Sequence, residues 1–275
     1  MNFPSLTKLL ESLINQFFRL ILVADFLSDS EFDELQEAVK NYPDLRLLRC
    51  DFGSAALTRN FGLAAVESEW VVFWDCDDMV NPDAYVTILQ SPQIDKFDIV
   101  VSQIEIESLS SSELVFSSKT KSLGQLGIRP AFTRIVYRTR FINGLVFVPV
   151  PLCEDQCFLA SVLSRSPRIM YSELVTYRYK IDNPFQGSNT LFSHDSHLRA
   201  SRFILNLSKQ TTNDEEITRT LLQMSLRLLL SSFKRVRLKN VNILPRLIID
   251  IFRITLKNPS LWMLNLRKIT IGIEA

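Results

Sequence analysis

Three carboxylates lie within four positions of the segment WVVFWDCDDM, directly after a run of five large apolar residues. Side chains two positions apart in an extended chain point to the same side, so Asp75 and Asp77 can converge on one point. Two carboxylates aimed at one point repel each other unless a cation or a proton lies between them. Mg²⁺ and Mn²⁺ bind one or two carboxylates together with phosphate oxygens. The spacing therefore predicts a divalent metal site that phosphate oxygens complete.

Other interpretations of this acidic cluster can be tested on the sequence. A calcium-binding EF-hand loop needs glycine at its sixth position and glutamate at its twelfth, where Val80 and Val86 stand. A Walker B strand needs an upstream GxxxxGK[ST] loop, and the chain contains none. Two alternatives stay open. The acids could cap a helix that begins near Asp83, or Asp75 could be the nucleophile of a haloacid-dehalogenase-like phosphatase, although Met79 replaces the usual Thr or Val.

Strands and helices alternate through the first third of the chain. The apolar run at residues 70–74 has no polar alternation, which predicts a strand covered on both faces in the middle of a parallel sheet. Ligands of such sheets bind outside the carboxyl ends of the strands. Helical spacing or capping residues predict helices at residues 5–16, 28–42 and 54–68, and apolar runs predict strands at 19–25 and 45–50. This order predicts an α/β fold.

The regular alternation of strands and helices ends at about residue 91. Strands are expected at residues 97–106, 128–138 and 169–179, and a polar-turned hairpin at residues 111–122. The segment CEDQCFLASVL reads as a helix whose first turn contains Glu154 and Asp155. From about residue 191 the pattern is helical to the end.

Four segments, spread over roughly residues 5–185, resemble motifs of the family 2 glycosyltransferases of the GT-A fold. LTKLLESLINQ is similar to the helix after the family's first strand, and ILVADFLSD to its second strand and the turn that follows. ALTRNFGLAAVESEWVVFWDCDD resembles the Arg-Asn-Gly helix and the strand that ends in DxD, and PLCEDQCFLASVL resembles the Glu-Asp motif before a helix. The resemblance implies a Rossmann-like, mostly parallel sheet with flanking helices, followed by a helical region.

The resemblance also implies a division of the chain. Residues 1–190 are expected to form the GT-A-like domain, with a nucleotide-binding part at about 1–90 and an acceptor-binding part at about 91–190. Residues 191–275 are expected to form a helical C-terminal region. The family normally begins with an apolar strand and a Pro-x-Tyr-Asn-like turn, whereas only MNFP precedes the first helix here. The central sheet is therefore expected to lack this strand.

The resemblance assigns the donor site. Asp77, with Asp75 and Asp78, is expected to hold Mn²⁺ or Mg²⁺ on the diphosphate of a nucleotide-sugar. Asp25 stands where the family has an acid that holds the nucleobase or ribose. Arg59 is expected either to anchor the diphosphate or to brace Asp75 through a charge-assisted hydrogen bond, and a surface arginine is the alternative. A UDP-sugar is the expected donor.

The resemblance also assigns the acceptor side and the reaction. Asp155 is expected to be the catalytic base, and Glu154 to contact the acceptor or orient the site. The structural alternative is that both acids only stabilise a helix N-terminus. The implied reaction is inverting transfer of a sugar to a glycan or lipid-linked acceptor, in the synthesis of a cell-surface polysaccharide. A phosphatase, or a non-catalytic interaction protein on a degenerate transferase fold, would be the alternative function.

Composition and charge limit the classes of partner that the chain can bind. With a net charge of +1 the chain is not a strongly basic nucleic-acid binder, and four cysteines without CxxC spacing read as reduced thiols of a cytoplasmic protein. The N-terminus is a poor signal peptide. Basic residues gather between Arg227 and Ala275, separated by apolar ones. These predict either a basic amphipathic surface in peripheral contact with the inner face of a membrane or a solvated face of a helical layer.

Overall fold

The computed structural model describes residues 10–11, 18–42, 44–108, 110–111, 113–181, 194–211, 214–234 and 249–250. The chain forms two compact units and passes between them repeatedly. The first unit consists of residues 1–121, 131–149 and 167–185, and the second of residues 122–130, 150–166 and 186–275. Segments that are distant in the sequence therefore share one core within each unit.

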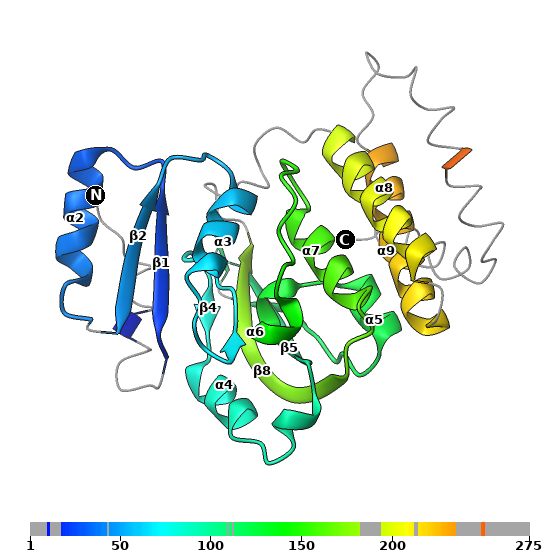
Figure 1. Ribbon diagram of the computed structural model, residues 1–275, viewed down its shortest axis with the longest axis horizontal. Helices are drawn as coiled ribbons and strands as arrows, with labels where there is room; N and C mark the ends of the chain where they lie inside the picture. The colour runs from blue at the N-terminus through cyan, green and yellow to red at the C-terminus, as the bar shows by residue number, and fades with distance from the viewer. Residues whose placement is uncertain are drawn as a thin grey trace. The chain divides into compact units, whose positions relative to one another are not determined.

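The first unit contains all the described strands (Figure 1). These are β1 (Leu20–Asp25), β2 (Leu45–Cys50), β3 (Trp70–Val71), β4 (Met79–Val80), β5 (Ile99–Ser108), β6 (Leu114–Ser117), β7 (Ile135–Arg138) and β8 (Ile169–Ile181). Its helices are α2 (Asp29–Val39), α3 (Ala55–Ala64), α4 (Pro82–Leu89) and α6 (Thr139–Ile142), with short 3₁₀ turns η1 (Ile94–Lys96) and η2 (Phe132–Arg134).

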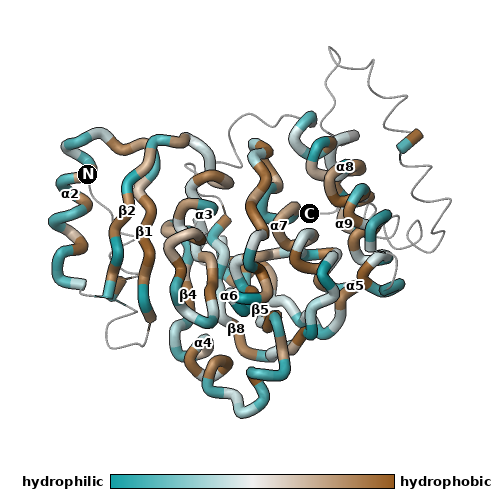
Figure 2. The backbone as a smooth tube through the Cα atoms, viewed as in Figure 1, coloured by the Kyte–Doolittle hydropathy of each residue, from teal (hydrophilic) through white to brown (hydrophobic). Residues whose placement is uncertain are grey.

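The strands β1 and β2 form a parallel pair, as expected of a βαβ unit. The connecting helix α2 begins at a capping box, in which the Ser28 side chain accepts from the Glu31 amide and the Glu31 side chain accepts from the Ser28 amide. Leu35 and Val39 of α2 are buried with Ala24 of β1 in one cluster. Figure 2 shows the hydrophobic residues of β1 that make this packing favourable.

The other six strands form one sheet in the order β3-β7-β5-β8-β4, with β6 paired to β5. Its only parallel ladder within the described residues joins β5 and β8, and the others are antiparallel. The α/β class is confirmed. The hairpin expected at residues 111–122 lies earlier in the chain than predicted, because β6 is its second strand and the end of β5 is its first.

The prediction of a central parallel strand at residues 70–74 is wrong. Only Trp70 and Val71 pair, with β7, and they do so antiparallel at one end of the sheet order. The run is apolar for another reason. Phe73 packs against rings that include Phe132 and Phe147, and Trp74 packs against Tyr85. Aromatic contacts therefore cover this segment, which a continuous apolar run cannot distinguish from strand neighbours.

An ion pair joins the starts of the parallel strands β5 and β8. The Arg168 guanidinium donates two hydrogen bonds to the Asp98 carboxylate, of 2.8 and 2.9 Å, and the Arg168 amide donates a third of 2.9 Å. These bonds with Arg168 hold the pKa of Asp98 below its ordinary value. The ion pair thus joins the beginnings of β5 and β8, and the register between the two strands shifts twice before Tyr177.

The second unit is helical. It contains α5 (Leu123–Ile128), α7 (Glu154–Leu163), α8 (His194–Gln210) and α9 (Glu215–Lys234). Leu198 of α8 is buried in one cluster with Leu222, Leu226 and Leu229 of α9. Gly127 of α5 lies so close to α9 that a Cβ atom would be 2.9 Å from Thr220 Cγ2, so the α5–α9 contact requires glycine.

Several expectations concern residues outside the described ranges. They are most of the helix at residues 5–16, the missing first strand, and most of the basic segment after residue 234. Where the structure describes helices, none combines the length and the apolar content that a membrane crossing needs.

Candidate active site

The acidic cluster forms a tight turn between β3 and β4 in the first unit. The Asp78 amide donates to the Asp75 carbonyl over 3.3 Å, which closes the turn. The helix that follows, α4, is capped by the side chain of Asn81, with Pro82 in its first turn. The alternative that the acids cap this helix is therefore wrong.

Arg59 of α3 holds the first acid of the turn. Its Nη2 atom donates to Asp75 Oδ1 over 2.9 Å, as the interpretation of Arg59 as a brace requires. The guanidinium also lies over the ring of Phe132, with its carbon 4.8 Å from the ring centroid, and 5.7 Å from that of Phe147. The charge-assisted bond and the two rings together restrict where the Asp75 carboxylate can point.

The residues next to Arg59 position its helix. The Asn60 side chain accepts a hydrogen bond of 2.7 Å from the Phe147 amide and donates one of 2.8 Å to the Phe147 carbonyl. A Cβ atom at Gly62 would lie 3.0 Å from Val23 Cγ2 of β1, so glycine permits the close approach of α3 to that strand. The Arg-Asn-x-Gly pattern thus links the acidic turn, β1 and the loop that contains Phe147.

The third acid of the turn points into the protein. Asp78 is 4% exposed, and its carboxylate accepts from the Tyr177 hydroxyl over 2.7 Å and from the Lys180 amide over 2.9 Å. Burial raises the pKa of the Asp78 carboxyl to about 7, although these two hydrogen bonds act in the opposite direction. Its oxygens are therefore committed to β8, whereas Asp75 and Asp77 are only half-buried.

The donor set of the turn fits a divalent cation that is shared with a diphosphate. No group of three or more His, Cys, Asp or Glu side chains in the described part of the chain could hold a metal ion by itself. Asp75 and Asp77, however, supply the one or two carboxylates that Mg²⁺ or Mn²⁺ takes from a protein when phosphates and water complete its shell.

Asp25 ends β1 and is bound by the turn before α3. Oδ1 accepts from the amides of Phe52 and Gly53, over 2.7 and 3.1 Å. Oδ2 accepts from the Ser54 amide over 3.2 Å and from the Thr58 hydroxyl over 2.5 Å. Partial burial acts to raise the pKa of Asp25, but these hydrogen bonds outweigh it and the pKa lies below its ordinary value.

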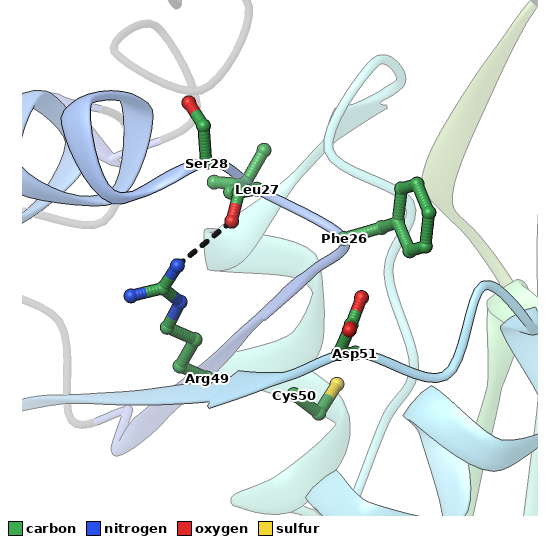
Figure 3. A pocket seen from close by; sticks show the side chains of 6 residues that line it. All are labelled: Phe26, Leu27, Ser28, Arg49, Cys50 and Asp51. Carbon is green, nitrogen blue, oxygen red and sulfur yellow. Dashed lines mark hydrogen bonds between the residues drawn. The ribbon is translucent and has the colours of Figure 1, made fainter.

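A pocket of about 530 Å³ lies beside Asp25, at the carboxyl ends of β1 and β2. It is lined by Phe26, Leu27, Ser28, Arg49, Cys50 and Asp51. Figure 3 shows Phe26 and Asp51 on one side, and Arg49 joined to the Leu27 carbonyl on the other. The sequence analysis does not predict Asp51 as a site residue. Its position directly after the predicted strand at residues 45–50 is the pattern that indicates such a role.

Glu154 and Asp155 lie in the second unit, in the first turn of α7, as predicted. The next residue, Gln156, accepts a hydrogen bond from Arg227 of α9. The Nε atom of Arg227 is buried and makes no hydrogen bond within the described part of the chain. Burial lowers the pKa of Arg227, and the charge of Asp155 acts in the opposite direction. A cation of α9 is therefore a neighbour of the candidate base.

Comparison with known proteins decides the family. The family model described as Glycosyl transferase family 2 matches residues 2–157, which is more than half of the chain. The chain belongs to glycosyltransferase family 2. The match covers the acidic turn, Arg59 and the Glu-Asp pair, so the predicted family is confirmed and the phosphatase alternative is not supported.

Two curated proteins are similar in sequence to this family 2 chain. Uncharacterized glycosyltransferase YibD of Escherichia coli (strain K12) is 24% identical over 227 residues, which cover 73% of this chain and 66% of YibD. Poly(ribitol-phosphate) beta-N-acetylglucosaminyltransferase TarP of Staphylococcus aureus (strain N315) is 25% identical over 210 residues, which cover 69% of this chain and 62% of TarP. The chain thus spans slightly less than two thirds of either relative.

A solved structure supports the fold. The crystal structure of Staphylococcus aureus TarS residues 1–349 in complex with UDP-GlcNAc matches with a TM-score of 0.68 and 18% sequence identity. The match covers 90% of this chain and 77% of the TarS chain. The family 2 chain therefore has the fold expected from its motifs, with helices after the sheet.

Proposed function

We propose that this protein transfers a sugar from a nucleotide-diphospho-sugar to a glycan or lipid-linked acceptor in the synthesis of a cell-surface polysaccharide. The main support for this proposal is the acidic turn, in which Arg59 binds Asp75 and Asp77 follows two residues later in the chain. The TarS complex with UDP-GlcNAc supports a UDP-sugar as donor. The name of TarP, which describes transfer to poly(ribitol phosphate), supports a cell-envelope polymer as acceptor.

On the donor side, Asp75 and Asp77 would hold Mn²⁺ or Mg²⁺ against the diphosphate. A bound cation would supply Lewis-acid stabilisation of the charge that develops on the leaving phosphate. Arg59 neutralises part of the charge of Asp75 and keeps its carboxylate oriented. The pocket between Phe26 and Asp51 is proposed to receive the nucleoside. Asp25 would contribute by fixing the turn at residues 52–54, which directly follows Asp51 of the pocket lining.

On the acceptor side, Asp155 is proposed to accept the proton of the attacking hydroxyl. The bond from this oxygen to the anomeric carbon forms as the bond from that carbon to the phosphate oxygen breaks, and the nucleoside diphosphate leaves. Attack from the face opposite the leaving group inverts the anomeric configuration. Glu154, in the same helical turn, is proposed to contact the acceptor or orient Asp155.

The site of action is proposed to be the cytoplasm, with peripheral contact at the inner face of the membrane. None of the four cysteines is joined in a disulfide, which supports a reducing compartment. The basic residues after Arg227 would supply the attraction to anionic lipid.

Calorimetric titration with UDP, in the presence and absence of MnCl₂, tests the donor assignment. UDP is expected to bind the protein only with Mn²⁺, and Asp77→Ala is expected to weaken binding at least about tenfold, because it removes a metal ligand. Asp44→Ala, which changes an exposed carboxylate in the turn before β2, is the matched control and should bind like the parent chain. Equal affinity of Asp77→Ala and the parent would refute the metal site.

A further inference from the structure

The acidic turn is attached at both ends to one strand of the sheet, β8. After the turn, β4 pairs antiparallel with β8, with Met79 opposite Arg178 and Val80 opposite Tyr177. The Asn81 amide then donates to the Thr176 carbonyl over 2.8 Å. Before the turn, the Asp75 amide donates to the Tyr177 hydroxyl over 3.2 Å. The segment that contains Asp75 and Asp77 is thus held on both sides by the same short stretch of β8.

The Tyr177 hydroxyl is the centre of this attachment. It accepts from the Asp75 amide and donates to Asp78 Oδ2 over 2.7 Å, so it joins the first and last residues of the turn. Tyr177 is 0% exposed, so solvent water does not reach the hydroxyl site to replace its hydrogen bonds if the hydroxyl is removed. A buried donor or acceptor left without its partner is costly. The turn geometry therefore depends on this oxygen.

We propose that Tyr177 is a positioning residue for the cation-binding carboxylates, which it places by fixing the backbone of the acidic turn from β8. The inference rests on the proposed function for the identity of the ligand. Arg59 fixes the Asp75 carboxylate, and Tyr177 fixes the backbone that bears it. Asp78 has a structural role in this arrangement, because its oxygens join the turn to Tyr177 and to the Lys180 amide.

Tyr177→Phe tests the inference, because it removes the hydroxyl and keeps the ring. Hydrogen exchange of the ligand-free protein is measured for the amides of residues 75–78 and for the rest of the first unit. Exchange at residues 75–78 is expected to accelerate at least about tenfold, with little change elsewhere. Exchange equal to that of the parent chain would overturn the inference. General acceleration across β5 and β8 would also overturn it, since Tyr177 would then support the whole sheet.

Tyr137→Phe is the matched control. Tyr137 is also 0% exposed, and its hydroxyl donates to the Phe132 carbonyl over 3.2 Å, outside the acidic turn. This variant is expected to lose a similar amount of stability without faster exchange at residues 75–78.

A titration with UDP and MnCl₂ separates the inference from the proposed function. Mn²⁺ is expected to raise the affinity of Tyr177→Phe for UDP about tenfold less than it raises that of the parent chain, and Tyr137→Phe is expected to behave like the parent. If the parent binds UDP with Mn²⁺ and Tyr177→Phe binds as tightly, Tyr177 does not position the carboxylates and the inference fails. If the parent itself binds no UDP, the donor assignment fails, and the exchange measurement still decides whether Tyr177 holds the turn.

Discussion

At the scale of single residues, the carboxylates differ in how many of their hydrogen bonds come from the protein itself. Asp25 accepts four such bonds and Asp78 accepts two while almost fully buried. Asp75 accepts a charge-assisted hydrogen bond from Arg59 and stays half-buried. A carboxylate saturated by internal donors positions the backbone, whereas one at the surface of a turn can still bind a cation.

Asp25→Ala is expected to lower the free energy of unfolding by about 1–3 kcal/mol, because three backbone amides lose a charged acceptor. Urea denaturation measures the change. Asp51→Ala, which removes an exposed acid next to the same turn, should leave the free energy of unfolding nearly unchanged. Equal stability of Asp25→Ala and the parent chain would contradict the assignment of Asp25 to the turn.

The contribution of the Asp25 carboxylate to the free energy of unfolding depends on pH. Its pKa in the folded protein is lower than its ordinary value of 3.8, so the folded state binds this proton less readily than the unfolded state. The stabilisation by Asp25 is therefore complete above pH 3.8 and is lost as the pH falls through the lower folded pKa. Below that pH, the difference in unfolding free energy between the parent and Asp25→Ala should shrink.

At the scale of elements, the helix that bears the candidate base is packed within the helical unit. The helix α7 contacts both α8 and α9, and Arg227 of α9 binds Gln156 in its first turn. The helices after residue 191 therefore help to place Glu154 and Asp155, although the family model ends at residue 157. Charge near Asp155 from another helix is the kind of contact that holds a base in position.

Arg227→Met is expected to lower the turnover number by about tenfold or more and to leave the donor dissociation constant unchanged. The substitution keeps an unbranched side chain, but it removes the hydrogen bond to Gln156 and the positive charge near Asp155. Steady-state kinetics and a UDP titration measure the two quantities. Arg219→Ala on the same helix breaks an exposed i,i+4 ion pair with Glu215 and should change neither. Unchanged turnover in Arg227→Met would show that α9 does not influence the base.

At the scale of the whole molecule, a net charge of +1 conceals an uneven distribution. Beyond Arg227 nine further lysine and arginine residues follow, against two acids. Attraction of basic residues to an anionic membrane surface adds up over such a segment and is screened by salt. A transferase with a lipid-linked acceptor would gain from this attraction, because it raises the local concentration of the acceptor.

The chain is expected to sediment with vesicles that contain phosphatidylglycerol and to be released by about 0.5 M salt. Triple reversal to glutamate at Arg246, Arg253 and Lys257 should weaken vesicle binding at least about tenfold. A matched reversal at the exposed first-unit residues Arg46, Lys96 and Lys119 should have a smaller effect. Equal loss in both variants would mean that net charge, rather than the C-terminal segment, drives binding.

The sequence by itself determined the features that depend on neighbours along the chain. The capping box of Ser28 and Glu31, the acid spacing at Asp75 and Asp77, and the first turn of α7 were all predictable. Each needs only residues a few positions apart. The family followed from the order of these local patterns.

Only the tertiary structure decided which acids remain for ligands and how the strands pair. Tyr177 lies 99 positions from Asp78, and no periodicity relates them. Asp25 meets its donors 27 to 33 positions later in the chain. The same holds for the run at residues 70–74, whose apolar character reflects rings brought from other segments. Such contacts depend on which segments fold against each other, and a pattern along one segment carries no information about its distant partners.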